Sequence, residues 1–95
     1  MEQKQKFSDF IEERKVLETF GCCKLADIAY RILEAVPDDT KKEEAGEAIA
    51  SALDDELIYY CDQWEVIAAY SNPEEPLGIA EASELFLGDL MRCID

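Results

Sequence analysis

Two kinds of side chain in this sequence could do chemistry: adjacent thiols and closely spaced carboxylates. Cys22 and Cys23 follow Gly21 where a helix is expected to begin, and the positive end of a helix dipole lowers the pKa of a thiol. Such a pair could respond to oxidation. The simpler interpretation is burial as small hydrophobes, because Cys22 precedes Leu25 by three residues and so continues the apolar face of that helix. Uneven spacing also argues against a disulfide framework for the four cysteines, which are Cys22, Cys23, Cys61 and Cys93.

The parts that most enzymes need are missing from the sequence. There is no histidine, the commonest general base, and no GxxxxGK[ST] phosphate loop. The thiols lack CxxC spacing for zinc, Glu-x-x-His pairs for a di-metal bundle are absent, and neither "PDDTKKEEAGE" nor "DDELIYYCD" has the ligand pattern of an EF-hand. We therefore expect a non-catalytic protein with no cofactor and no specific metal site. A weak, unspecific divalent-cation site among the acids is the alternative left open.

The carboxylates are concentrated in one half of the chain. The sequence has 23 acidic and 9 basic residues, a net charge of −14. Residues 1–42 hold 9 acids and 8 bases, a net of −1, whereas residues 43–95 hold 14 acids and one base, a net of −13. A field of this sign repels nucleic acid and anionic membranes. The expected partners are basic protein surfaces or cations.

Several acids stand three or four residues apart, which makes them neighbours on a helix at roughly 5–6 Å between Cβ atoms. The pairs are Glu43/Glu47, Glu44/Glu47 and Asp62/Glu65. Charges at that spacing resemble the phosphates along a nucleic-acid strand, and each unpaired couple costs a few tenths of a kcal/mol of helix stability. The opposing interpretation is a plain solvated face, although ordinary surfaces intersperse both signs of charge.

Helices must position these acids, because apolar residues recur at helical spacing almost throughout. Ser8 is expected to cap a first helix that ends at Gly21. The second has the clearest pattern, with one apolar face from Leu25 to Val36, and it should stop before Pro37. Thr40 and Glu43 predict a capping box for a third helix, with inward residues Ala45, Ala48, Ile49, Ala52 and Leu53.

Residues 55–70 are also predicted to be helical, although the pattern leaves open whether "DD" at 54 and 55 starts a new helix or continues the third. Leu57, Cys61, Trp64, Ile67 and Ala68 would share one side, which makes this the most enclosed helix and a suitable place for the only tryptophan. "SNPEEPLG" ends it. A last helix is expected from Ile79 to Ile94, with Ile79, Ala82, Phe86, Leu90 and Ile94 inward and Glu81, Glu84 and Asp89 outward.

Together these elements predict an all-α protein, a compact bundle of four to five helices in a single domain over residues 1–95. No apolar run is long enough to span a membrane, and the start "MEQKQKFSDF" lacks the apolar block of a signal peptide. We therefore expect a cytoplasmic protein. Tyr59, Tyr60 and Tyr70 cannot all fit a small core, and exposed tyrosines beside carboxylates are typical anchors of a protein interface. Packing against the first or last helix is the simpler alternative for any one of them.

A resemblance starts at these residues. "DELIYYCDQWEVIAAYSNP", followed by "IAEASELFLGDL", resembles a segment of short proteins from bacteriophages and mobile elements, and covers roughly the second half of the chain. In size, charge and helical character the chain is similar to anti-CRISPR and anti-restriction inhibitors. The resemblance implies an inhibitor that binds stoichiometrically in the basic groove of a host defence complex, within the host bacterial cytoplasm. It transfers no individual residue roles.

Two hypotheses follow. In the first, the protein imitates nucleic acid and binds a basic surface of a nuclease or other nucleic-acid-binding effector. The candidate partner-binding residues are Glu43, Glu44, Glu47, Asp54, Asp55, Asp62, Glu65, Glu74, Glu75, Glu81, Glu84, Tyr59 and Tyr60. In the second, the chain is a structural or regulatory helical module that self-associates, as a homodimer for example, or completes a partner's bundle through the apolar face of residues 57–70. Neither hypothesis requires contact with nucleic acid or membrane.

Overall fold

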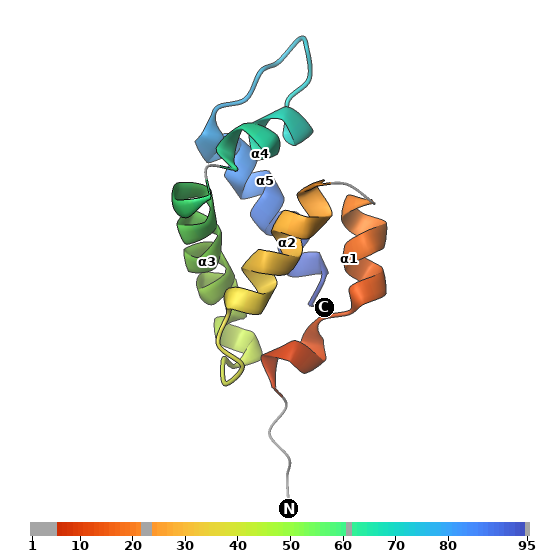
Figure 1. Ribbon diagram of the computed structural model, residues 1–95, viewed down its shortest axis with the longest axis vertical. Coiled ribbons are helices and arrows are strands. Elements are labelled where there is room, and N and C mark those ends of the chain that lie inside the picture. The colour runs from red at the N-terminus through yellow and green to blue at the C-terminus, as the bar shows by residue number, and fades with distance from the viewer. Residues whose placement is uncertain (1–5, 22–23, 61, 95) are drawn as a thin grey trace, which may run out of the picture.

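A computed structural model describes residues 6–21, 24–60 and 62–94, and over these residues the chain forms five α-helices, two short 3₁₀ helices and no strand (Figure 1). The α-helices are α1 (Glu13–Phe20), α2 (Lys24–Ala35), α3 (Ala45–Tyr59), α4 (Gln63–Tyr70) and α5 (Ile79–Arg92). The 3₁₀ helices are η1 (Phe7–Phe10) and η2 (Lys42–Glu44). The all-α bundle predicted from the sequence is confirmed. None of the helices in the described part of the chain is long and apolar enough to cross a lipid bilayer.

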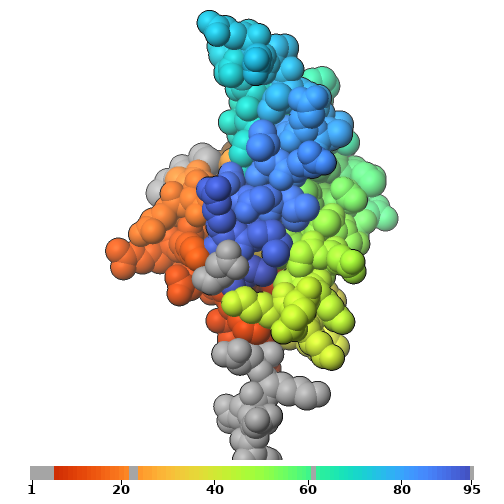
Figure 2. Space-filling model, turned by 180° about the vertical axis from the view of Figure 1, so that it is seen from behind, coloured from red at the N-terminus to blue at the C-terminus, as the bar shows by residue number. Residues whose placement is uncertain are grey.

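α5 lies at the centre of the bundle. α2 crosses in front of it, α1 and α3 lie on either side, and α4 packs against its first turns (Figure 1). Seen from behind, α5 occupies the middle of the surface between α1 and α3 (Figure 2). η1 and all five α-helices contribute to one cluster of buried apolar side chains. The largest side chains that are almost fully buried are Phe7, Phe86, Ile28, Ile32, Leu33, Ile49, Leu90 and Ile94.

The two helices with the cleanest apolar periodicity are the ones predicted best. α2 buries Ile28, Ala29, Ile32 and Leu33, and it ends at Ala35, two residues before Pro37. α5 buries Ala82, Phe86 and Leu90 as expected, while Glu81 and Glu84 are exposed. An apolar stripe at this spacing has only one orientation that removes it from water, so sequence and tertiary packing agree.

The amino-terminal prediction of one helix from Ser8 is wrong. Phe7–Phe10 is a 3₁₀ turn, and Ile11 and Glu12 have extended backbone before α1 begins. The cap position of this turn is Lys6, and Ser8 lies within the turn. Instead, the backbone N–H groups of Phe7 and Ser8 donate to the carbonyl and carboxylate oxygens of Asp38, at 2.8 and 2.9 Å. The hydrogen bonds from Ser8 to the carboxylate lower the pKa of Asp38, and together with the bond from Phe7 they hold the turn against the loop after α2.

The predicted capping box at Thr40 is also wrong. The Thr40 N–H donates to the carbonyl of Pro37 at 3.0 Å and so closes the turn after α2. The chain then passes through η2, and α3 starts at Ala45 without a side-chain cap from Glu44. Thr40 was predicted to cap the third helix, but it belongs to the turn that follows Pro37.

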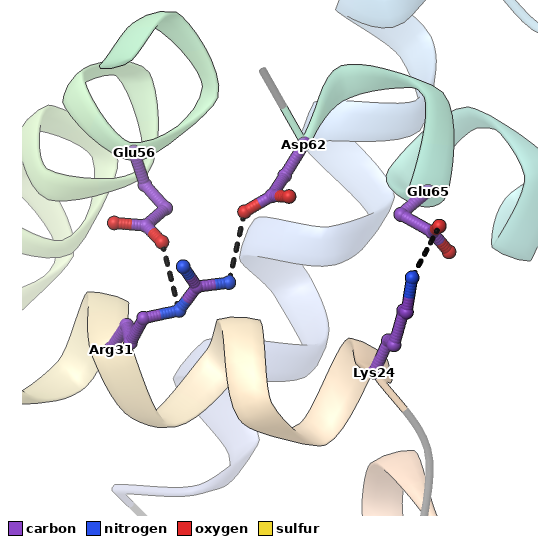
Figure 3. A network of polar contacts seen from close by, with 5 residues as sticks. All are labelled: Lys24, Arg31, Glu56, Asp62 and Glu65. Carbon is purple, nitrogen blue, oxygen red and sulfur yellow. Dashed lines mark hydrogen bonds and ion pairs between the residues drawn. The ribbon is translucent and has the colours of Figure 1, made fainter. Parts of the chain in front are cut away.

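The prediction of unbroken helix over residues 55–70 fails at a break between α3 and α4. α3 passes straight through Asp54 and Asp55 and ends at Tyr59, and α4 starts at Gln63. On a continuous helix, side chains six residues apart would point in well-separated directions. The break brings Glu56 and Asp62 to the same arginine, Arg31 (Figure 3).

The segment predicted to be the most enclosed is largely exposed over α4. Trp64 is 78% exposed, Ala68 is exposed, and only Val66 in α4 is buried. α4 has only two turns and lies at one end of the molecule, so few of its side chains pack against α5. Cys61 lies outside the described residues.

Asp89, expected to face outward, is half-buried. The Tyr70 hydroxyl donates to its carboxylate at 2.6 Å, and this bond joins the end of α4 to α5. Burial first, and the neighbouring Asp89 second, raise the pKa of Tyr70 well above its usual range. Tyr70 is therefore a packing residue, as the simpler alternative had it.

Gly21 connects α1 to the next segment with φ 70° and ψ −174°, a backbone region that is accessible almost only to glycine. Because a Cβ at this position would meet nothing within 4 Å, the cost of Gly21→Ala is purely conformational. We expect a loss of about 1–3 kcal/mol in the free energy of unfolding, measured by urea denaturation. Gly88→Ala is the matched control: its Cβ would also meet nothing within 4 Å, but Gly88 lies within α5. That change should stabilise the protein by about 0.5–1 kcal/mol.

Candidate binding surface

The outward side of α3 carries a row of acids without cationic partners. Glu47, Ser51, Asp54, Asp55, Ile58 and Tyr59 recur at the spacing of a single helix face, and all six side chains are exposed. We call these six residues the α3 ridge. Among the described residues, no lysine or arginine forms an ion pair with its three carboxylates. The negative potential of the ridge is therefore screened only by solvent and salt.

The same face ends in large apolar side chains. Ile58 is 66% exposed and Tyr59 79%, and Trp64 follows in the first turn of α4 at 78%. Tyr60 is 60% exposed, and the Arg31 guanidinium lies over its ring at 5.1 Å from the centroid. Solvated surfaces rarely collect this much aromatic area beside uncompensated charge, whereas protein interfaces are enriched in it.

Two of the predicted partner-binding acids are already paired within the molecule. Arg31 on α2 reaches Asp62 with a terminal nitrogen at 2.9 Å, and Lys24 at the start of α2 reaches Glu65 at 3.6 Å (Figure 3). These cations come from the nearly neutral first half of the chain. Asp62 and Glu65 therefore join α4 to α2, and their charge is largely compensated at the surface.

Arg31 also neutralises a buried carboxylate. The side chain of Glu56 is 7% exposed, and its Oε1 lies 3.1 Å from Arg31 Nε, although the angle does not meet hydrogen-bond geometry. Burial raises the pKa of Glu56, while Arg31 lowers it and Asp62 raises it further. Arg31 thus connects three helices through one guanidinium.

The remaining predicted acids do not form one continuous face. Glu74 and Glu75 lie in the loop between α4 and α5, where their N–H groups donate to the Asn72 side-chain oxygen at 2.9 and 2.7 Å. That loop and η2, which holds Glu43 and Glu44, are at opposite ends of the bundle (Figure 1). Glu43 lines a hollow of mixed charge, which also holds Lys6, Lys41, Lys42, Asp38 and Asp39.

Two grooves run along α3, one on each side of the ridge. The α3–α5 groove has a volume of about 460 Å³ and is lined by Ala50, Leu53, Asp54, Leu57, Ile58, Gln63, Ile79, Ala80, Ser83, Glu84 and Leu87. The α2–α3 groove has about 620 Å³ and is lined by Arg31, Glu34, Ala35, Pro37, Ala48, Ser51, Ala52, Asp55, Glu56, Tyr59 and Tyr60. The first is mainly apolar at its floor, and the second holds the Arg31–Glu56 pair.

The described residues give no support to the hypothesis of a reactive thiol or to that of a metal site. Cys93 is buried, and burial raises its pKa, so this thiol is protonated at neutral pH and enclosed. Cys22 and Cys23, the pair with expected redox chemistry, lie outside the described residues. No group of three or more Cys, Asp or Glu side chains in the part of the chain that the structure describes could hold a metal ion.

Sequence reasoning missed Ile58 and Trp64 as surface residues. The signal was present in "LIYY", because Leu57, Ile58, Tyr59 and Tyr60 project in four directions 100° apart around a helix. A helix with a one-sided contact can bury only part of such a run, and here Leu57 takes the inward position.

Comparison with known proteins adds no further identification. No protein-family model, no curated protein and no solved structure matches this chain. The resemblance to phage-encoded inhibitors stays a prediction, and the chemistry of the α3 surface is the basis for a functional conclusion.

Proposed function

We propose that this protein is a non-catalytic, stoichiometric binding protein. Its α3 ridge docks on the basic surface of a nucleic-acid-binding protein, such as an effector of a bacterial defence system, and excludes nucleic acid from it. The observation that carries the proposal is the direct continuity, on one helix, of unpaired carboxylates with the exposed side chains of Ile58 and Tyr59. Carboxylates would steer the approach, and the apolar end would supply the buried contact.

Contacts within the molecule leave fewer acids available for the proposed binding. Asp62 and Glu65 are paired with Arg31 and Lys24, and Glu74 and Glu75 are far from η2. A continuous imitation of a phosphate strand from residue 43 to residue 65 would need those pairs broken. The α3 ridge alone, about 12 residues or ~18 Å of helix at 1.5 Å per residue, is the segment that supports the proposal.

Charge reversal on the ridge tests this proposal. The triple variant Glu47→Lys, Asp54→Lys, Asp55→Lys should weaken binding to a partner isolated by pull-down at low salt by roughly a hundredfold. The control variant Glu12→Lys, Glu13→Lys, Asp39→Lys changes net charge equally at exposed acids with no ion pair, away from α3. It should retain most of the affinity, provided that circular dichroism shows both variants to be folded.

Experiments with the purified partner then distinguish inhibition from simple association. Wild-type protein should displace a DNA or RNA oligonucleotide from it in a one-to-one ratio, and affinity should fall steeply as salt rises. Equal loss of affinity in both triple variants would contradict a localised ridge. Salt-insensitive binding that leaves nucleic acid in place would contradict the proposed inhibition.

Self-association is the second candidate function, favoured by the exposed apolar side chains of Ile58, Tyr59 and Trp64. Two copies that met through this surface would bring like-charged ridges together, so any dimer should strengthen with salt. Sedimentation velocity at low and high salt distinguishes this behaviour from the proposed inhibitor, whose binding weakens with salt.

A further inference from the structure

The α3–α5 groove has the form of an unfinished helix bundle. α3 contributes Ala50, Leu53 and Leu57, and α5 contributes Ala80, Ser83 and Leu87. Both sets have the spacing i, i+3, i+7, which is the spacing that packs helices together. The two helices run in opposite directions and lie side by side on the back of the molecule, so the stripes face one groove (Figure 2).

The dimensions of the groove suit a short helix. The lining residues span 50–58 on α3 and 79–87 on α5, nine residues each, or roughly 13 Å of helix. Small side chains leave room for a third backbone at both ends of the groove, Ala50 on α3 at one end and Ala80 on α5 at the other, because the two helices are antiparallel. Ile58, which is exposed, and Leu87, which is half-buried, offer the apolar contacts of the lining, while Leu53 and Leu57 beneath them already belong to the core.

The charges beside the groove indicate which kind of helix it would bind. Asp54 stands on the α3 side of the groove and Glu84 on the α5 side, both exposed, and neither is paired with a cation among the described residues. A helix with an apolar stripe and arginine or lysine on both flanks would place cations beside both acids. A second copy fits poorly, because its two helices with the most cations, α1 and α2, each carry two cations together with two acids.

We propose that the α3–α5 groove binds a basic amphipathic helix of the partner protein, about two and a half turns long. The proposal rests on the proposed function and specifies its partner: the helix enters the groove while the rest of the basic surface lies on the α3 ridge. Ile58 belongs to both surfaces and would sit at their junction.

Three stapled 14-residue peptides serve as probes. The first has a leucine stripe with arginine flanks, the second has the same stripe with glutamate flanks, and the third is a scrambled arginine peptide without a stripe. The arginine-flanked peptide should bind by isothermal titration at least tenfold more tightly than the other two. Amide shifts in nitrogen–proton correlation spectra should concentrate at Ala50, Leu57, Ala80 and Leu87.

Matched variants locate the contact. Glu84→Arg should weaken this peptide at least tenfold, whereas Glu81→Arg should not; Glu81 is an exposed, unpaired acid of α5 outside the groove. Ala80→Trp should block the groove, and Ala69→Trp, at an exposed position of α4, should not. Ala80 is exposed in the first turns of α5, so both tryptophan variants should fold, which circular dichroism checks.

The outcomes separate this inference from the proposed function. No saturable binding of the arginine peptide, equal binding of the scrambled peptide, or shifts outside the groove would overturn the groove proposal. A dimer that Ala80→Trp abolishes would identify a second copy as the occupant and overturn it as well. The double variant Glu47→Lys, Asp55→Lys tests the function independently, because neither acid lines this groove, whereas Asp54 of the triple variant does.

Discussion

Replacing Phe86 by alanine should bring the domain close to unfolding. The Phe86 ring on α5 is fully buried and makes edge-to-face contact with Phe20 of α1 at 5.3 Å between ring centroids. Its centroid is 6.0 Å from that of Tyr70 on α4. Removing a buried phenylalanine costs about 3–5 kcal/mol, from lost burial and from the cavity left behind. The total free energy of unfolding of a 95-residue domain is roughly 5–14 kcal/mol.

Thermal unfolding followed by circular dichroism measures this effect, and the midpoint should fall by roughly 15–25 °C. Leu85→Ala is the control: Leu85 is the neighbouring residue of α5 and is 50% exposed, so its loss should cost about 0.5 kcal/mol. Similar losses for both variants would mean that α5 does not face the core with Phe86. Because Phe86 holds α4 through Tyr70, amide shifts in Trp64 and Asp62 are also expected.

Arg31→Met should destabilise the protein by about 2–4 kcal/mol at pH 8, because it leaves the buried Glu56 carboxylate without a cation. The guanidinium is 43% exposed, which places the effect at the lower end of what breaking a fully buried pair costs. Urea denaturation is the measurement. The double variant Arg31→Met, Glu56→Leu should recover to within about 1 kcal/mol of wild type, since both charges are then gone.

The loss in Arg31→Met should also depend on pH. The pKa of Glu56 is already above its ordinary value of 4.5, and removal of Arg31 deletes the cause that lowers it. Between 4.5 and that raised pKa, the folded protein binds more protons than the unfolded chain, so stability falls as pH rises through this window. The variant should therefore be closest to wild type near pH 5 and furthest from it at pH 8. A pH-independent difference would assign the effect to lost packing of the arginine stem.

The helices were predicted well where one apolar face decides the outcome. α2 and α5 have continuous stripes, and the structure buries them as expected. α3 to α4 was predicted poorly because "LIYYCDQWEVIAAY" is apolar on all sides, and periodicity then cannot say which side turns inward. The prediction assumed that a continuous apolar helix is an enclosed one, whereas here the surplus side chains of Ile58, Tyr59 and Trp64 are left outside.

In the candidate site, too, some features could be predicted from the sequence and others could not. The sequence leaves open which tyrosines lie outside, and the structure exposes Tyr59 and Tyr60. The exposure of the acids at 47, 54 and 55 followed from the sequence, which predicted an acidic surface there. The pairing of Asp62 and Glu65 with α2 did not, since Arg31 and Lys24 are more than 30 residues away in the chain. The partner-binding assignment of all 13 residues stays a prediction, which the ridge and groove variants test.

The sequence by itself determined the helical class, the inward faces of α2 and α5, and the excess of negative charge in the second half. These depend on residue type and local spacing, which the chain carries wherever it folds. Only the tertiary structure decided where α3 ends, which acids are neutralised, and that α3 and α5 leave a groove between them. Each of those features needs atoms from distant segments to meet, as Arg31 of α2 meets Glu56 and Asp62 on the two sides of the break between α3 and α4.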